Sequence, residues 1–336
     1  MERNKIDKIL PDIYRIPVQL KGNPLKELNS YLISGGGKTN NLLIDTGFRN
    51  PVSREEIKEA FKILGLSLDQ TDILLTHLHA DHTGNAFDLI VPGNKIYMSE
   101  KDIAYIVGKD GEDRNDAIHK NRAERLQKHG IDKALIEEMI ACVPSRCMAA
   151  NMNKRDFTPL KEKDEIQVGD YVLKAIYTPG HTPGHMCFEI KGTGAMILGD
   201  HILFDITPNI TDWENCENSL KDYLLSLDKI AQYNVSIPLP GHRKTGDFLK
   251  RIEYLKCHHI KRLIECRIII EKLGKAYLYD IAGGMKWKIR SSGWEDFPAA
   301  QRWFALGECM AHIDFLKNAS LIKEHETDGV IWYEAI

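Results

Sequence analysis

The chain lacks the features that would direct it to a membrane or to nucleic acid. Its 336 residues contain no run of about eighteen apolar residues, the length that a membrane-spanning helix requires. The 45 basic and 48 acidic residues leave a net charge of −3, which provides no general attraction to nucleic acid or to an anionic membrane. The first eight residues, Met-Glu-Arg-Asn-Lys-Ile-Asp-Lys, contain no apolar core of a signal peptide. We therefore expect a cytoplasmic protein whose partner is a small molecule.

A disulfide framework is not expected either. The seven cysteines are odd in number and show no paired spacing. In a chain without an export signal they are expected to be reduced thiols. The hydrophobic fraction of 43% is enough for a substantial core, and the length fits one large and one small domain.

Residue types that bind metals are concentrated behind an apolar stretch early in the chain. Ile73-Leu74-Leu75 is followed by Thr76-His77-Leu78-His79-Ala80-Asp81-His82, which places four such side chains within six residues. His77 and His79 alternate at the end of a predicted strand and can face one ion, whereas Asp81 and His82 lie a turn further on and can serve a second. Imidazole and carboxylate groups are ligands of zinc and also suit iron or manganese. A solvated polar loop is the weaker interpretation of this pattern.

Three more ligand-type residues follow apolar stretches later in the chain. Each stands beside a glycine, which lets the backbone approach a site closely. A single Gly-His or Gly-Asp pair is more often a turn than a ligand, but three in this order favour one shared site. They are His181, after the stretch 171–177, Asp200, after 195–198, and His242, after 236–239.

Together these motifs resemble the metallo-β-lactamase superfamily over roughly residues 10 to 245. The family pattern is an early Asp at a strand end, His-x-His-x-Asp-His, a distant His, an Asp and a final His. The early Asp is Asp45, within Ile44-Asp45-Thr46-Gly47. The resemblance implies an α+β fold, a four-layer αββα sandwich with the metals at one edge.

The resemblance also implies the ligands of two divalent metal ions, with zinc the first choice and iron or manganese as alternatives. The first ion would be held by His77, His79 and His181, and the second by Asp81, His82 and His242. Asp200 would bridge them, and Asp45 would orient a ligand without binding metal. His185 is interpreted as a structural residue or as a partner of a ligand.

The chemistry that such a site implies is hydrolysis. Two divalent ions generate hydroxide near neutral pH and polarise a carbonyl or phosphoryl oxygen, so that no Ser or Cys nucleophile is needed. Asp81 is the candidate to hold the hydroxide and to exchange a proton. True β-lactamases of this fold lack a bridging Asp at the position of Asp200, and diiron flavoproteins place Glu where His79 stands, so both activities are disfavoured.

The residues around the ligands, at 178–185 and 198–204, resemble the glyoxalase II branch, lactonases and a lactamase-like ribonuclease branch. The leading expectation is a small activated acyl substrate, a thioester or a lactone. No counterpart of the glutathione-binding segment of glyoxalase II is recognisable. The alternatives are a phosphodiesterase or ribonuclease, a mononuclear-iron persulfide dioxygenase and a DNA-binding ligand sensor with a degenerate site. The full ligand set disfavours the sensor.

The interval between His82 and His181 is long enough to be structured, and residues 101–156 are predicted to form a helical insertion in a catalytic domain of residues 1–250. Helical spacing is seen at 101–108, 115–130 and 132–143. The insertion is expected either to cap the substrate pocket or to be a solvated decoration. Candidate anion contacts within it are Arg146, Asn151, Lys154 and Arg155.

Residues 251–336 are predicted to form a winged-helix-like domain, because helices at 248–273, 276–285 and 298–317 precede a hairpin of 321–326 and 330–335. Nucleic-acid recognition is disfavoured, since from Arg251 onward 13 basic residues face 12 acidic ones. We expect this region to pack on the catalytic domain or to mediate a homodimer. Trp287, Trp294 and Trp303 suit such an interface or a small core.

Overall fold

The computed structural model of the protein describes residues 6–108, 114–143, 157–288 and 291–336. Its larger sheet has seven strands in sequence order, antiparallel from the first to the fourth and parallel from there on. These strands are β1 (Asp7–Leu10), β2 (Ile13–Gln19), β3 (Glu27–Ile33), β4 (Asn41–Ile44), β5 (Thr71–Leu74), β6 (Ile96–Ser99) and β7 (Thr158–Leu160).

The second sheet has five strands in the order β12-β11-β10-β9-β8, with one parallel pair between β11 and β12. They are β8 (Glu165–Val168), β9 (Tyr171–Tyr177), β10 (Met186–Ile190), β11 (Ala195–Gly199) and β12 (Ile237–Pro240). The strands predicted from the apolar stretches before His77, His181, Asp200 and His242 are therefore confirmed.

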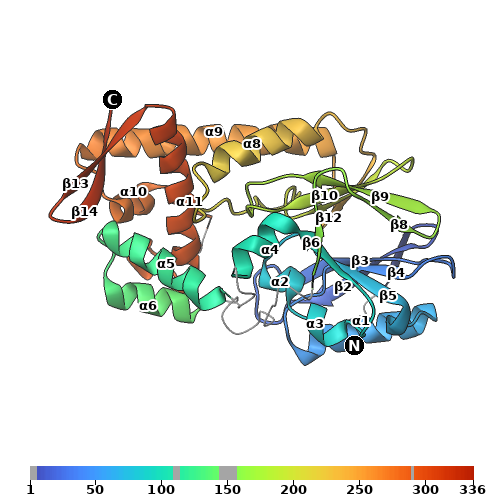
Figure 1. The fold of residues 1–336 in the computed structure, drawn as a ribbon. Coiled ribbons are helices and arrows are strands. Elements are labelled where there is room, and N and C mark those ends of the chain that lie inside the picture. Colours follow the sequence, from blue (N-terminus) through green and yellow to red (C-terminus); the bar gives the residue numbers. More distant parts are fainter. Residues whose placement is uncertain (1–5, 109–113, 144–156, 289–290) are drawn as a thin grey trace.

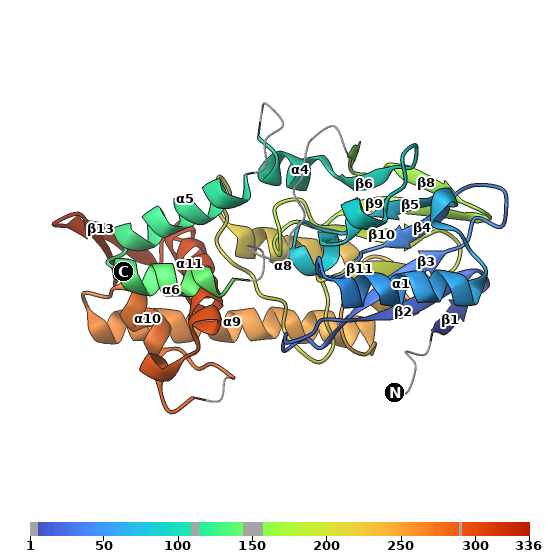
Figure 2. The same ribbon diagram turned by 90° about the horizontal axis from the view of Figure 1, so that it is seen from below.

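Side-chain alternation along the strands builds the layers of the fold. In β4, Leu42 and Ile44 belong to the core between the two sheets, whereas Leu43 belongs to the core beneath helix α1 (Pro51–Leu64). Successive residues of a strand point to opposite faces, so a fully apolar strand must be covered on both sides. Figure 2 shows α1 running along the outer face of the larger sheet.

The outer face of the second sheet is covered by α8 (Ser219–Ile230) and α9 (Phe248–Leu273). Ile176 and Leu198 of the sheet share one buried cluster with Leu227 of α8 and Ile252 of α9. Helix, sheet, sheet and helix thus follow one another, which confirms the predicted four-layer αββα sandwich.

The described part of the segment predicted as a helical insertion contains α4 (Glu100–Ile106), α5 (Asn115–Lys128) and α6 (Lys133–Ala141). Helix α4 stays beside the sandwich, but α5 and α6 pack against α11 (Ala299–Asn318) and β14 (Val330–Ala335) at the far end of the molecule (Figure 1). The insertion and the C-terminal region therefore share a core. The proposed anion contacts at 146, 151, 154 and 155 lie outside the described residues.

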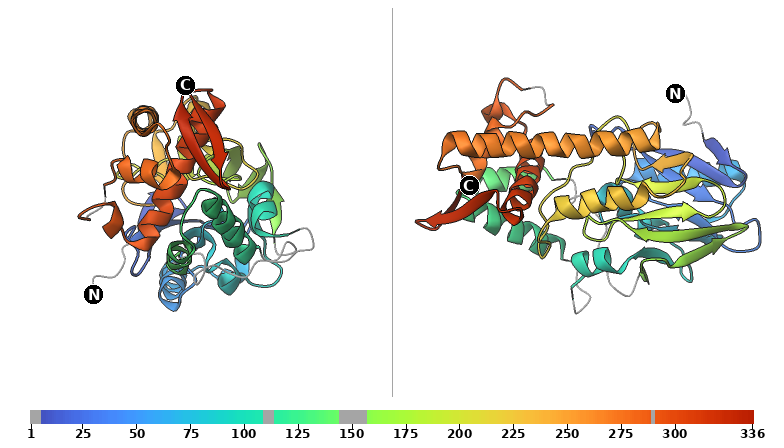
Figure 3. Two further views of the ribbon diagram at one scale, coloured as in Figure 1. Left: turned by 90° about the vertical axis from the view of Figure 1, so that its left-hand side faces the viewer. Right: turned by 90° about the horizontal axis from the view of Figure 1, so that it is seen from above.

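The C-terminal region has the predicted order of elements: α9, α10 (Leu278–Gly284), α11 and the hairpin of β13 (Ile322–Thr327) and β14. Pro298 precedes α11 as its cap and does not form its first turn. Helix α9 is 26 residues long and runs from the sandwich into this region (Figure 3). The winged-helix classification stays a prediction.

Among the described residues, no helix is both long and apolar enough to cross a membrane.

Met139 tests whether the helical insertion and the C-terminal region share a core. This side chain of α6 is 0% exposed and belongs to the same buried cluster as Leu306 and Met310 of α11. Met139→Ala should lower the free energy of unfolding by about 2–5 kcal/mol in urea titrations, the usual cost of such a truncation in a core. The neighbouring, exposed Glu138 provides the control, since Glu138→Ala should change stability little. Equal effects of the two substitutions would contradict the shared core.

Candidate metal centre

The predicted ligands of the early motif lie at the carboxyl end of β5. His77 and His79 occupy the loop after this strand, and Asp81 and His82 lie in the single-turn helix α2 (Ala80–Thr83). Strand β4 runs parallel to β5, so Asp45, directly after β4, lies at the same edge. The residues predicted together from sequence are thus brought to one place by the pairing of two parallel strands.

The later ligand candidates reach the same edge from the second sheet. His181 follows β9, Asp200 follows β11 and His242 follows β12. The glycines beside them are required by close packing. A Cβ on Gly241 would lie 2.6 Å from Asp200 Oδ1, and one on Gly199 would lie 2.7 Å from His185 Nε2.

The seven side chains form three overlapping groups, each with ligand atoms within 4.8 Å of one another. His77 Nε2 lies 3.0 Å from His79 Nδ1, and His82 Nε2 lies 3.3 Å from His242 Nε2. Two ligands of a tetrahedral zinc ion lie about 3.3 Å apart, because zinc–nitrogen bonds are about 2.0–2.1 Å long. The groups are His77, His79 and His181; His77, His82 and Asp200; and Asp81, His82 and His242.

Asp200 stands between the groups. Its carboxylate oxygens lie 3.5 Å from His82 Nε2, 3.5 Å from His242 Nε2 and 3.7 Å from His181 Nε2. Asp81 Oδ2 lies 3.3 Å from His242 Nε2. The placement of Asp200 between the two sets of histidines is the one that a bridging carboxylate requires.

The outer nitrogens of these histidines are held by the protein. His82 Nδ1 donates to Asp45 Oδ2 at 2.7 Å, His181 Nδ1 donates to the carbonyl of Asn209 at 2.9 Å, and His242 Nδ1 donates to the carbonyl of Glu27 at 2.8 Å. Such bonds fix the ring orientation, so that each Nε2 faces the cluster. Asp45 touches His82 in the manner expected of an orienting residue.

Within the described residues, no hydrogen-bond partner is found for two buried, inward-facing atoms of the cluster, His181 Nε2 and Asp200 Oδ1. Unpaired buried polar atoms are costly, and a cation at this point would satisfy both. The set of imidazole and carboxylate donors is also the one that divalent transition metals prefer. The residues present therefore fit a divalent metal site.

The electrostatics of the cluster differ between its two sides. Burial lowers the pKa of His79 to about 3 and that of His77 well below its usual value, so both imidazoles are neutral and can donate lone pairs. Burial also acts against protonation of His82, but the carboxylates of Asp45, Asp200 and Asp81 outweigh it and raise the pKa of His82 well above its usual value. Negative charge is therefore concentrated on the side of His82.

Asp102 helps to hold the loops of the candidate metal centre, and the sequence alone did not identify it. This fully buried residue of α4 accepts hydrogen bonds from Leu78 N (2.9 Å), Thr182 Oγ1 (2.8 Å) and Gly184 N (2.6 Å). It thereby ties the loop of His77 and His79 to the loop of His181. Burial raises the pKa of Asp102 to about 7, against the opposing effect of the three donors. No local pattern marks it, since its partners are distant in sequence.

His185 and Trp213 complete the surroundings. His185 Nε2 accepts from the backbone N–H of Asp200 at 3.2 Å, which agrees with the predicted supporting role. Trp213 stacks on the ring of His79 with centroids 5.9 Å apart, and Tyr105 meets Trp213 edge-on at 5.2 Å. These two rings form an aromatic wall beside half-buried His79. Trp213 was missed because it lies in an irregular segment.

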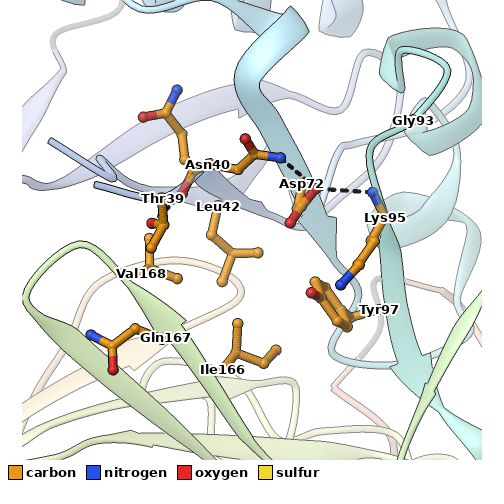
Figure 4. A pocket seen from close by; sticks show the side chains of 11 residues that line it. Thr39, Asn40, Leu42, Asp72, Gly93, Lys95, Tyr97, Ile166, Gln167 and Val168 are labelled. Atoms are coloured by element: carbon orange, nitrogen blue, oxygen red, sulfur yellow. Dashed lines mark hydrogen bonds between the residues drawn. The ribbon is translucent and has the colours of Figure 1, made fainter. Parts of the chain in front are cut away.

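A separate pocket of about 290 Å³ lies at the opposite end of the sandwich, where β4, β5 and β6 begin (Figure 4). Leu42, Ile166 and Val168 form its apolar side, and Asp72 accepts from Asn40 Nδ2 and from the backbone N–H of Lys95. Its lining contains neither histidine nor cysteine. The ligand-type chemistry therefore belongs to the other end of the strands.

Comparison with known proteins agrees with this geometry. The profile described as "Metallo-beta-lactamase superfamily" matches residues 26–242. The lactamase-like protein adaB of Aspergillus niger is 24% identical over 90% of this chain and 89% of its own length. The atrochrysone carboxyl ACP thioesterase nsrC of Aspergillus novofumigatus is 25% identical over 70% of this chain, which spans only 56% of that relative. The lactamase-like protein vrtG of Penicillium aethiopicum is 26% identical, and the chain spans 64% of its length.

Solved structures extend the likeness over the whole chain. A metallo-beta-lactamase family protein from Thermus thermophilus superposes with a TM-score of 0.79 at 26% identity, covering 98% of this chain and 100% of the other. A beta-lactamase domain protein from Burkholderia ambifaria reaches 0.83 at 23% identity, covering 100% and 95%. The chain belongs to the metallo-beta-lactamase superfamily.

The link made by Asp102 can be tested by its removal. Asp102→Ala leaves two backbone N–H groups and one hydroxyl without their acceptor, and each buried donor left unsatisfied costs about 1–3 kcal/mol. We expect the free energy of unfolding of the metal-free protein to fall by about 3 kcal/mol or more in urea titrations. Asp88→Ala removes a carboxylate that pairs with Arg49 and Arg54 at the surface and should cost less than about 1 kcal/mol. Similar losses in both variants would contradict the role of Asp102.

Proposed function

We propose that this protein hydrolyses a small activated acyl compound, a thioester or a lactone, with two divalent metal ions. The observation that carries the proposal is the convergence of seven ligand-type side chains, among which His82, His181 and His242 have their outer nitrogens bonded to the protein. In this proposal His77, His79 and His181 hold one ion, and Asp81, His82 and His242 hold the other. Asp200 bridges the ions, and zinc is the first candidate metal.

Bound divalent ions would supply Lewis acidity and water with a pKa near neutrality. The protein residues do the remaining work. Asp81, with a side chain 13% exposed, is the carboxylate best placed to accept a proton from the attacking water and return it to the leaving group. Burial opposes its ionisation, but His82 and His242 lower the pKa of Asp81 to about 2, which keeps it a base at neutral pH. Trp213 and Tyr105 cover one side of His79 with aromatic surface.

Two observations support an acyl substrate. The relative nsrC is named as a thioesterase that acts on an acyl carrier protein. The segments that carry His181 and Asp200 resemble those of glyoxalase II, a thioester hydrolase.

A persulfide dioxygenase is the alternative that a single bound iron ion would favour. The expected cytoplasmic location and a homodimer stay predictions.

The environment of α11 supports a role other than nucleic-acid binding. Its arginine and lysine residues, Arg302 and Lys317, could in principle contact a nucleic-acid groove, but both side chains are bonded to other residues of the protein. Arg302 donates to the carbonyls of Trp294 and Glu295, and Lys317 pairs with Glu324 at 2.8 Å. Contacts with phosphate groups need cationic side chains that are free to bind them. Helix α11 therefore gives no support to the phosphodiesterase or ribonuclease alternative.

Metal content and turnover test the assigned roles. Elemental analysis should find two divalent ions per chain, and Asp200→Ala should release at least one, because the bridging charge is lost. Asp81→Asn should lower kcat by roughly a hundredfold or more, the scale of general acid–base effects. Asp170→Asn, at the far end of the sandwich with a side chain 78% exposed, should leave both readouts unchanged. Normal turnover of Asp81→Asn would refute its role as proton acceptor.

A substrate panel distinguishes the reaction classes. We expect the metal-loaded protein to hydrolyse thioesters or lactones and not to cleave RNA or simple phosphodiesters. We also expect DNA and single-stranded RNA to bind no tighter than about 10⁻⁴ to 10⁻⁶ M at physiological salt, the non-specific range. Metal-dependent cleavage of RNA, or a tight and salt-sensitive complex with it, would replace the acyl proposal by the ribonuclease alternative.

A further inference from the structure

His181 is oriented by a segment that has no regular structure of its own. Residues 201–218 connect β11 to α8 and contain neither helix nor strand. The carbonyl of Asn209 in this segment accepts the hydrogen bond from His181 Nδ1. The orientation of the imidazole therefore depends on whatever holds Asn209 in place.

Asn209 is held by the C-terminal helices. Its side-chain Nδ2 donates to Glu308 Oε2 at 3.3 Å, across 99 positions of the sequence. The other oxygen of Glu308 accepts from Arg262 Nη2 at 3.3 Å. Glu308 lies on α11 and Arg262 on α9, so both long helices of the C-terminal region take part in this link.

Arg262 is itself firmly placed. Its side chain is 7% exposed, and Nη1 donates to the carbonyl of Lys286 at 2.9 Å and to Glu265 Oε2 at 2.8 Å. The guanidinium also lies 4.2 Å from the centre of the Trp287 ring. A residue with this many contacts provides a rigid support for Glu308.

We propose that Glu308 is a positioning residue of the metal centre. It holds Asn209 so that the Asn209 carbonyl fixes the ring of His181 and directs Nε2 to the metal. The inference rests on the proposed metal ligation by His181 and assigns part of the site to the C-terminal region. Loss of such an outer partner typically weakens metal binding by about 10- to 100-fold.

A purely structural role for the carboxylate is the competing explanation, since Glu308 also joins α9 to α11 through Arg262. Glu265 provides a matched control. It accepts from the same arginine, but no hydrogen bond with Asn209 is found for it among the described residues. Removing either carboxylate disturbs Arg262, whereas only the loss of Glu308 releases Asn209.

The test measures zinc affinity by competition with a chromophoric chelator, together with thermal unfolding of the metal-free protein. Asn209→Ala and Glu308→Ala should each weaken the binding of one zinc ion by about tenfold or more. The double variant should be no weaker than either single one, because both act on one link. Glu308→Gln should recover most of the affinity, since its amide oxygen can accept from Asn209. Glu265→Ala should bind zinc as the unmodified protein does.

Unchanged zinc affinity in Asn209→Ala would overturn the proposal, and this variant decides the matter even if Glu308→Ala does not fold. Equal losses of affinity in Glu308→Ala and Glu265→Ala would also overturn it, in favour of a structural role. If the unmodified protein bound no zinc at this site, the proposed function would fail together with this inference. Zinc binding by the unmodified protein that the variants leave intact would contradict the inference alone.

Discussion

The structure depends on the concentration of three carboxylates in one buried cluster. As whole residues, Asp45, Asp81 and Asp200 are at most 9% exposed, and buried charge is stable only when it is paired or coordinated. Asp45 is paired with Thr76 and His82 inside the protein. Asp81 and Asp200 face five histidines, and no hydrogen-bond partner is found for Asp200 Oδ1 in the part of the chain that the structure describes. A cation at this position would compensate the buried negative charge of these carboxylates. Its binding would explain why loops from both sheets converge at this point.

The fold makes this concentration possible by dividing the work between two sheets. The parallel strands β4 and β5 of the larger sheet and β11 and β12 of the second sheet end at one edge, where they are followed by Asp45, the His77–His82 motif, Asp200 and His242. Asp102 joins the loops across the sandwich, and the irregular segment 201–218 is secured from the C-terminal side. The helical insertion and the C-terminal region share one buried apolar cluster with α8 and α9. The second sheet is therefore connected to both regions by continuous side-chain packing.

Local sequence patterns predicted the elements that precede the ligands, and helix α9 was predicted at its observed bounds, Phe248–Leu273. The layer order and the assignment of ligands to two ions came from the family resemblance and not from periodicity. Asp102, Asn209 and Glu308 could not be predicted, because each acts through a contact with residues far away in sequence. The packing of α5 and α6 on the tail was missed for the same reason. Amphipathic spacing shows that a helix has an apolar face but not which element covers it.

The central claim is that two metal ions lie in the cluster with Asp200 between them. Anomalous diffraction from crystals of the zinc-loaded protein, collected on either side of the zinc absorption edge, tests it most directly. The account predicts two anomalous peaks about 3.5–4 Å apart, the usual separation in two-metal sites. One should lie among His77, His79 and His181, and the other among Asp81, His82 and His242. A single peak, or peaks away from these side chains, would contradict the account.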